Sequence, residues 1–411
     1  MVWFPACGAS TGGEPISTDA SAQSDGVATV ADVTAPDATP PSPTGLPATR
    51  VTTSKDDELY PDLDPKDADA LVYVVSRLDP AKLPKGTTVA PNCIQCPTCQ
   101  GCAMEVWHKN VSSGKATKLT DAASGWLNSS PRISGGVPYW LRNSNELMEY
   151  DFSKQAPVVL TFTAPPTPQN PWTQQYYFNN VPELSDGVYY WYGWHQAHNK
   201  NGILRVKRGT TQVELVVEDN LYHWYFGNGG GSNLGRRQVF TVSDNRIAYP
   251  RYDHDTGVQR VRYMLYDLKT GQKTTLADAD GYTVVGGILG GGRVAWKRAD
   301  AKKGCSEQGC EIDLVAKELT GTELGVGSSA AKPSVYAELV MAGSWLLWVD
   351  YREVTYAVYG VDLASNERRE VRVTGEEAVV GAYVGPVVSG NRIVWMDRRS
   401  GNWDLWRAEM K

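Results

Sequence analysis

The cysteines are the residues of this chain whose spacing could support chemistry. Four of them follow the pattern C-x2-C-x2-C-x2-C, namely Cys93, Cys96, Cys99 and Cys102. Thiolates at this spacing can bind an iron–sulfur cluster or a zinc ion. In an oxidising compartment the same residues would instead form disulfides that hold a long exposed loop together. We expect disulfides, and therefore no metal and no cofactor, because other features of the chain point to export.

The pairing of these cysteines stays open, because four cysteines allow three connectivities. A nested arrangement, Cys93–Cys102 with Cys96–Cys99, would suit a hairpin centred on Pro97-Thr98. Two further cysteines, Cys305 and Cys310, most simply close the small loop between them. Closing so short a loop stabilises a fold less than closing a long one.

Sequence patterns of known catalytic sites are weak in this chain. Its one G-x-S-x-G match, Gly8–Gly12, lies in a Ser/Thr/Ala/Pro-rich segment and not in a strand-to-helix elbow, and it has no H-E-x-x-H helix and no glycine-rich phosphate loop followed by a helix. His195, His198 and His223 could share one face and hold a metal, but lone loop histidines are usually solvated. We therefore assign no catalytic residue and no metal site, and we expect a binding module more than an enzyme.

Short β-strands that recur along the chain are the elements that must position these residues. A triplet of two apolar residues and one aromatic residue recurs at intervals of about 50 residues. Its copies are Leu71-Val72-Tyr73, Val137-Pro138-Tyr139, Val188-Tyr189-Tyr190, Ile247-Ala248-Tyr249, Val294-Ala295-Trp296, Leu346-Leu347-Trp348 and Ile393-Val394-Trp395. Small or polar residues usually precede the triplet and predict a tight turn between two strands. A third strand such as Met264–Leu268 and a fourth such as Lys273–Leu276 follow.

Four strands in a period of about 40–50 residues are typical of propeller blades. We therefore predict an all-β fold, a seven-bladed β-propeller; the alternative is a β-sandwich, in which seven copies are hard to place. The pattern S-x-G-x-x-V-x-W … D-L-Y-x-x-D-L … L-T resembles the WD-repeat-like units of TolB-type β-propellers over roughly residues 50–411. The small α/β domain that precedes the propeller in TolB has no counterpart here. The resemblance therefore implies the fold and not TolB's own role.

The two ends of the repeat region are expected to complete one blade together. The last repeat supplies only three strands, Val379–Val388, Arg392–Met396 and Trp403–Glu409. A blade without its outer strand has an exposed edge. The β-prone run Thr49–Thr53 lies ahead of Leu59–Asp64, which resembles an innermost strand. We predict that this N-terminal run pairs with the last strand and closes the ring; otherwise residues 49–58 would be linker and the ring would be open.

The N-terminal region resembles an anchor followed by a tether. Cys7 follows a short apolar segment that ends in Pro5-Ala6, which resembles the end of a bacterial lipoprotein signal, although much of such a signal is missing. The alternative is an ordinary cysteine in a tail. Residues 8–48 are rich in Ser, Thr, Ala and Pro and are typical of a disordered tether. We thus divide the chain into a signal remnant with tether (1–48) and a propeller (49–411), located in the bacterial cell envelope as an outer-membrane lipoprotein, or periplasmic or extracellular.

Composition limits the partners that we expect. The net charge is −6, and no basic run is interleaved with aromatic residues, so we do not expect nucleic acid. No apolar stretch approaches the ~18 residues needed to cross a bilayer. Contact with a membrane would therefore be made only through a lipid on Cys7. We expect the protein to be a monomer.

Long loops between the predicted strands gather on one face of the propeller, because the strands of a blade alternate in direction. Loops on a rigid scaffold often carry function. Aromatic and arginine side chains in these loops suit a protein, a peptide or a glycan. The residues that we predict to bind are Trp172, Trp194, Tyr222, Trp224, Tyr225, Arg236 and Arg237. Two alternatives stay open: the rings only pack the loops together, or the protein is a propeller-fold polysaccharide hydrolase or lyase with carboxylates in its central funnel.

Overall fold

The computed structural model describes most of the repeat region and a short segment ahead of it. The described residues are 45–53, 56–78, 102–120, 128–143, 146–164, 174–175, 181–195, 200–219, 221, 240–253, 260–277, 282–300, 312–321, 323–324, 326, 333, 339–352, 355–366, 368, 370–380 and 384–410. All their regular elements are β-strands. Within these ranges no helix has the length and apolar character needed to pass through a lipid bilayer.

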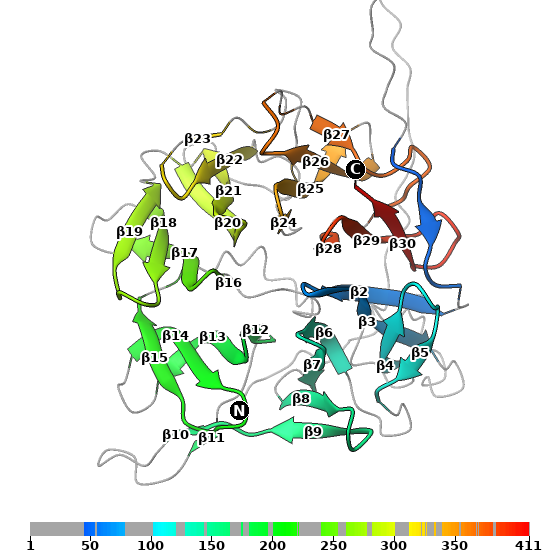
Figure 1. Cartoon of the computed structure of the whole chain (residues 1–411), viewed down its shortest axis with the longest axis horizontal. Helices are drawn as coiled ribbons and strands as arrows, with labels where there is room; N and C mark the ends of the chain where they lie inside the picture. The colour runs from blue at the N-terminus through cyan, green and yellow to red at the C-terminus, as the bar shows by residue number, and fades with distance from the viewer. Residues whose placement is uncertain are drawn as a thin grey trace, which may run out of the picture.

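Seven four-stranded antiparallel sheets form blades around a common centre (Figure 1). Blade 1 consists of β2 (Asp57–Asp64), β3 (Asp67–Leu78), β4 (Cys102–Asn110) and β5 (Ala116–Lys118). Blade 2 consists of β6 (Asn128–Ser134), β7 (Val137–Arg142), β8 (Glu146–Asp151) and β9 (Ala156–Leu160). Blade 3 consists of β12 (Glu183–Ser185), β13 (Val188–His195), β14 (Lys200–Lys207) and β15 (Glu214–Glu218). Blade 4 consists of β16 (Thr241–Ser243), β17 (Arg246–Asp253), β18 (Arg260–Asp267) and β19 (Lys273–Ala277). Blade 5 consists of β20 (Tyr282–Gly290), β21 (Arg293–Asp300), β22 (Ile312–Glu318) and β23 (Glu323–Leu324). Blade 6 consists of β24 (Val340–Ala342), β25 (Trp345–Arg352), β26 (Thr355–Asp362) and β27 (Glu370–Arg372). Blade 7 consists of β28 (Val387–Ser389), β29 (Arg392–Asp397), β30 (Asp404–Glu409) and β1 (Thr49–Arg50), and a separate pair is formed by β10 (Thr163–Ala164) and β11 (Gln174–Gln175).

The predicted fold class is confirmed, and the repeated triplets lie inside it. The aromatic residue of every triplet is buried, with exposed fractions between 0% and 5%. Trp348 packs in the cluster that joins blades 5 and 6, and Trp395 packs in the cluster that joins blades 6 and 7. Burying an apolar side chain of this size stabilises a fold by about 1.5–3 kcal/mol. The triplets therefore hold neighbouring blades together.

The turns between the first and second strands of the blades form one face of the ring, which we call the tight-turn face. In blade 4 both central turn residues have positive φ, 52° at Asp244 and 58° at Asn245. Such angles define the type I′ turn, which matches the twist of a hairpin and favours Asn, Asp and Gly. We call the opposite face, where the loops between blades begin, the long-loop face.

The N-terminal strand completes blade 7, as predicted. β1 pairs antiparallel with β30 as the outermost strand of that blade (Figure 1). Beyond β1, the N–H of Val51 donates to the Leu405 carbonyl at 2.7 Å, and the N–H of Leu405 donates to Thr52 Oγ1 at 2.9 Å. Arg50 Nη2 lies 2.6 Å from the fully buried Asp404 carboxylate. The last strand therefore has a paired edge.

Contacts with the propeller begin ahead of residue 49. The N–H of Leu46 donates to the Val373 carbonyl at 2.9 Å, and Leu46 and Ala48 pack against the cluster between blades 6 and 7. A Cβ added at Gly45 would lie 2.3 Å from the carbonyl carbon of Thr374, so only glycine fits there. Residues 45–48 thus lie against blade 6. The rest of the predicted tether, with Cys7, is outside the described residues.

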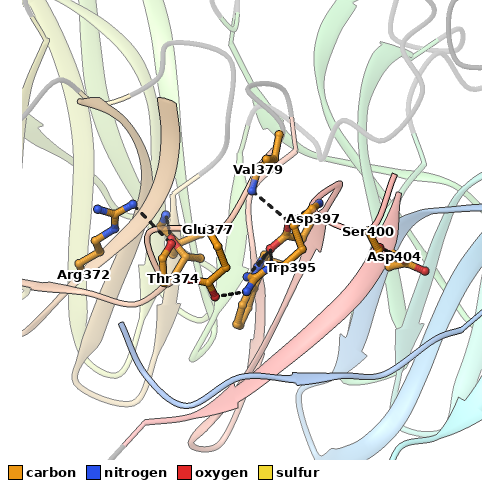
Figure 2. A network of polar contacts seen from close by, with 11 residues as sticks. Arg372, Thr374, Glu377, Val379, Trp395, Asp397, Ser400 and Asp404 are labelled. Carbon is orange, nitrogen blue, oxygen red and sulfur yellow. Dashed lines mark hydrogen bonds and ion pairs between the residues drawn. The ribbon is translucent and has the colours of Figure 1, made fainter. Parts of the chain in front are cut away.

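A buried carboxylate fastens blade 7 to the chain that enters it. Asp397 accepts a hydrogen bond from the N–H of Val379 at 3.0 Å (Figure 2). It also accepts one from Arg399 Nε at 2.8 Å. Val379 is therefore part of this connection and not of the innermost strand. As a consequence, β28 is shorter than the predicted strand Val379–Val388.

Ring closure can be tested by two truncations. Removing residues 1–44 leaves every contact described above and should leave the melting temperature nearly unchanged. Removing residues 1–53 takes β1 and the ion pair to Asp404, so it should lower the melting temperature by several degrees and promote association through the open edge. Thermal unfolding and light scattering measure both effects. Equal melting temperatures and equal solubility would show that the N-terminal strand does not close the ring.

Candidate functional site

The candidate site is built on the innermost strands of the seven blades. The third residue before each tight turn occupies an equivalent position, and we call these seven residues the inner layer. In blade order they are Asp62, Arg132, Glu183, Thr241, Ile288, Val340 and Val387. The inner layer is thus polar in blades 1 to 4 and aliphatic in blades 5 to 7. This division gives the centre of the ring two chemically different sides.

Most of the polar residues of the inner layer hold the next blade. An innermost strand has one edge without a neighbouring strand, so some of its N–H groups need other acceptors. The side chain of one blade accepts the backbone N–H of the following blade. The contacts, donor first, are Ile133 to Asp62 Oδ2 at 3.0 Å, Val242 to Glu183 Oε1 at 2.9 Å and Leu289 to Thr241 Oγ1 at 3.0 Å.

Blade 2 solves the same problem differently, because an arginine cannot accept a hydrogen bond. Here the hydroxyl of Tyr139 accepts the N–H of Leu184 in blade 3 at 3.1 Å. Burial raises the pKa of Tyr139 well above its usual range, and the charge of Asp62 adds to this rise. The hydroxyl therefore stays protonated and neutral. Arg132 is left available for another role.

Two equivalent bulges aim Asp62 and Arg132 at each other. The pairing register shifts at Tyr60-Pro61 in β2 and at Ser130-Pro131 in β6. Tyr60 and Ser130 have positive φ, 52° and 51°, which non-glycine residues seldom adopt. Bulges of this kind re-aim the side chains beside them and are frequent next to functional sites. Arg132 Nη1 and Asp62 Oδ1 are 3.6 Å apart, and both residues are more than nine-tenths buried.

A cavity of about 530 Å³ lies over the inner layer, at the tight-turn end of the central axis. Its lining comes from the ends of the innermost strands of all seven blades and from the tight turns of every blade except blade 2. At its rim, Lys66 Nζ in blade 1 lies 3.0 Å from Asp186 Oδ1 in blade 3. Between them the turn of blade 2 is Gly135-Gly136, which has no side chain to intervene. The volume of the cavity falls in the usual range for small-ligand sites, about 300–1,000 Å³.

Acidic groups outnumber basic groups in the cavity lining. The ionisable side chains there, apart from the neutral Tyr139, are Asp62, Glu183, Asp186 and Asp244 against Lys66 and Arg132. All of them come from blades 1 to 4. Among the described residues, no group of three or more His, Cys, Asp or Glu side chains is placed to hold a metal ion.

The site residues predicted from sequence lie mostly outside the described residues. Of the predicted binding residues only Trp194 is described; it lies near the end of β13 and is 46% exposed. The others, Trp172, Tyr222, Trp224, Tyr225, Arg236 and Arg237, are outside, so a binding role for this set stays a prediction. Among the histidines considered for a metal, His195 is buried, whereas His198 and His223 are outside.

Most of the cysteines that we predict to form disulfides also lie outside the described residues. Cys102 begins β4, where its backbone pairs with Leu78. The remaining cysteines, Cys7, Cys93, Cys96, Cys99, Cys305 and Cys310, lie outside the described residues. Their pairing stays a prediction.

Sequence reasoning missed the inner layer. The sequence signal for its charged pair was a proline inside each of two innermost strands, in Tyr60-Pro61-Asp62 and Ser130-Pro131-Arg132. Proline inside a strand often marks a bulge. That the two bulges face each other is a property of the ring and cannot be read from either segment alone.

The described geometry defines the class of the protein as a closed seven-bladed β-propeller with a cavity at its axis. No family model matches the sequence, and the search of curated proteins finds no match. Whether the chain belongs with the TolB-type, WD-repeat-like propellers stays a prediction.

Solved structures of similar fold include two lyases and one protease domain. An oligogalacturonate lyase in complex with manganese has a TM-score of 0.53 and 13% identity, over 90% of this chain and 94% of that chain. The oligogalacturonate lyase of Vibrio parahaemolyticus has a TM-score of 0.51 and 10% identity, over 89% and 93%. The propeller domain of the trilobed protease of Pyrococcus furiosus, described as an open velcro topology, has a TM-score of 0.53 and 11% identity, over 88% and 97%. At such identities the likeness shows the fold alone.

The structural importance of the inner layer can be tested at Asp62. Asp62→Leu removes the acceptor of the Ile133 N–H and leaves Arg132 as a buried charge without its partner, so it should lower the free energy of unfolding by about 3–5 kcal/mol. Asp186→Asn is the matched control, because it breaks an exposed pair and should change that free energy by less than about 0.5 kcal/mol. Denaturant unfolding measures both. Equal effects would mean that the inner layer does not hold the blades.

Proposed function

We propose that the protein is a binding module that receives its ligand in the cavity at the tight-turn end of the propeller axis. The observation that carries this proposal is the two-sided lining, with charged groups from blades 1 to 4 and small or aliphatic groups from blades 5 to 7. Because the ring is closed by β1, the cavity is formed before any ligand arrives. A preformed site loses little conformational entropy when it binds.

The existing contacts of the two inner-layer carboxylates, Asp62 and Glu183, favour binding over catalysis. A general acid or base must be able to exchange a proton with the substrate. Asp62 and Glu183 instead accept backbone N–H groups of the next blade, and Asp186 pairs with Lys66. Using either of the first two for proton transfer would disturb the contact between blades. This supports a binding role for the lining.

A polysaccharide hydrolase or lyase remains the second candidate, because two of the similar folds are oligogalacturonate lyases. An oligogalacturonate carries one carboxylate on each sugar unit. The acidic excess of this cavity would repel such a polyanion. The charge of the lining thus argues against that particular substrate.

We also propose that the long-loop face is a second contact surface, for a protein, a peptide or a glycan. The support within the described residues is the exposure of Trp194 at 46% and of Tyr351 at 43%, both near the ends of second strands. Tyr351 packs against Tyr356 with ring centroids 4.8 Å apart. Nucleic acid is not among the proposed partners, and we propose a monomer.

Filling the cavity should abolish ligand binding without unfolding the ring. Ala342 lines the cavity at its aliphatic side and is partly exposed, so Ala342→Trp should occupy the cavity. Thr274→Trp, on the exposed outermost strand of blade 4, is the matched control. Arrays of short peptides, neutral oligosaccharides and oligogalacturonates would identify ligands, and calorimetry would compare the variants.

We expect the control to bind like the wild type and Ala342→Trp to lose at least tenfold in affinity at an unchanged melting temperature. Ligands that bind both variants equally would contradict a site in the cavity. Cleavage of any oligosaccharide by the wild type, lost in Ala342→Trp, would favour the enzymatic alternative.

We further propose that the protein is held at the bacterial cell envelope by a lipid on Cys7. The support is the Pro5-Ala6-Cys7 segment ahead of a tether-like sequence. Expressed behind a bacterial lipoprotein signal, the chain should take up labelled fatty acid and partition into detergent. Cys7→Ser should do neither. Equal labelling of this variant would contradict the anchor.

A further inference from the structure

The cavity offers different chemistry on its two sides, and the difference follows from the register of the innermost strands. Blades 5 to 7 present small and aliphatic residues, of which Met341, Ala342 and Val388 are partly exposed. The turns of blades 5 and 6 also lie close together: a Cβ at Gly291 would be 2.5 Å from the Gly343 carbonyl oxygen. That side is therefore smooth and apolar and suits an aliphatic group.

Arg132 offers a hydrogen-bond donor that the described residues do not satisfy. The residue is 9% exposed, and its Nη2 atom has no hydrogen-bond partner there. Its Nη1 atom faces Asp62 at 3.6 Å, which neutralises the charge but is long for a hydrogen bond. A buried donor without a partner is unfavourable, and a ligand oxygen would remove the penalty if the guanidinium group turned this atom toward the cavity that Arg132 lines. Arg132 therefore favours a ligand with a carbonyl oxygen or a similar acceptor.

The carboxylates at the rim of the cavity favour a cationic group of a ligand. Asp244 lines it in blade 4 and is exposed; among the described residues no basic side chain pairs with it. Within the described part of the chain, the neighbouring Asp186 forms its ion pair with Lys66 alone, and both side chains of that pair are largely exposed, 80% and 68%. Exposed pairs contribute little and separate easily. An ammonium group at this rim would therefore find carboxylates from two adjacent blades.

We infer that the cavity binds an apolar primary amine with a carbonyl oxygen next to its ammonium group, as in the amino terminus of an apolar peptide. The ammonium lies at Asp244 and Asp186, the carbonyl oxygen accepts from Arg132, and the aliphatic side chain packs against blades 6 and 7. This inference rests on the proposed function and specifies its ligand. A neutral sugar would leave both the aliphatic side and the acidic excess unmatched.

The test is titration calorimetry with leucyl-leucinamide, which has a free ammonium group and no carboxylate. N-acetyl-leucyl-leucinamide lacks the ammonium, and 3-methylbutylamine keeps the ammonium and the branched chain but lacks the carbonyl. We expect both to bind at least tenfold more weakly than leucyl-leucinamide. Added salt should weaken the binding of leucyl-leucinamide, because the rim is exposed.

Asp244→Asn is the informative variant of the protein. Asn adopts positive φ as readily as Asp, so the turn, where φ is 52°, should be unaffected. We expect about tenfold weaker binding of leucyl-leucinamide. Asp313→Asn is the matched control, since Asp313 is an exposed residue of β22 paired with Arg298 at 3.3 Å, and it should bind like the wild type.

The outcomes separate this inference from the proposed function. Equal binding of the acetylated and free peptides, or equal affinities of the Asp244→Asn and Asp313→Asn variants, would overturn the ligand class. Binding of 3-methylbutylamine as strong as that of leucyl-leucinamide would overturn the role of Arg132. If Ala342→Trp still abolished the binding of some other ligand, the cavity would stand as the site; if it abolished none, the proposed function itself would fail.

Discussion

Every innermost strand of a closed propeller has one edge without a strand beside it, and the backbone N–H groups on that edge need acceptors. In blades 2 to 5 of this protein, a side chain of the preceding blade accepts one of these N–H groups. Asp62 serves blade 2, Tyr139 serves blade 3 and Glu183 serves blade 4. At these four junctions, polar residues near the centre of the ring therefore hold neighbouring blades together. Two of the charged residues that line the cavity, Asp62 and Glu183, are therefore also residues that join blades.

Closure of the ring adds a second constraint. The last blade has three strands from the C-terminus and one from the N-terminus, so its stability depends on contacts between the chain ends. Arg50 and Asp404 form one such contact, and Asp397 fastens the connection into the same blade (Figure 2). Because these contacts hold blade 7 to the N-terminal segment and to the connection from blade 6, the ring cannot open there without breaking buried polar contacts. The cavity at the axis therefore keeps its shape and its two-sided lining.

The repeat, the blade count and the closing strand could be predicted because their signals are local: aromatic triplets, turn residues and a β-prone run. The start of the folded region could not be predicted, because the sequence around Gly45 and Leu46 resembles the tether in composition and only the structure shows their contacts with blade 6. The inner layer was missed for a similar reason. Asp62 and Arg132 are far apart in the sequence, and only the ring places them 3.6 Å from each other. The predicted aromatic set, apart from Trp194, lies in loops whose arrangement is outside the described residues.

The double role of the inner layer limits where ligand specificity can reside. A change at Asp62 or Glu183 alters both the cavity and the junction with the next blade, so it would affect stability as well as the binding that we propose. Asp244 is different, because it lies at the exposed rim in a turn whose conformation also suits asparagine. In the binding role that we propose, the charge of the rim, and not the fold shared with the lyases, would select the ligand.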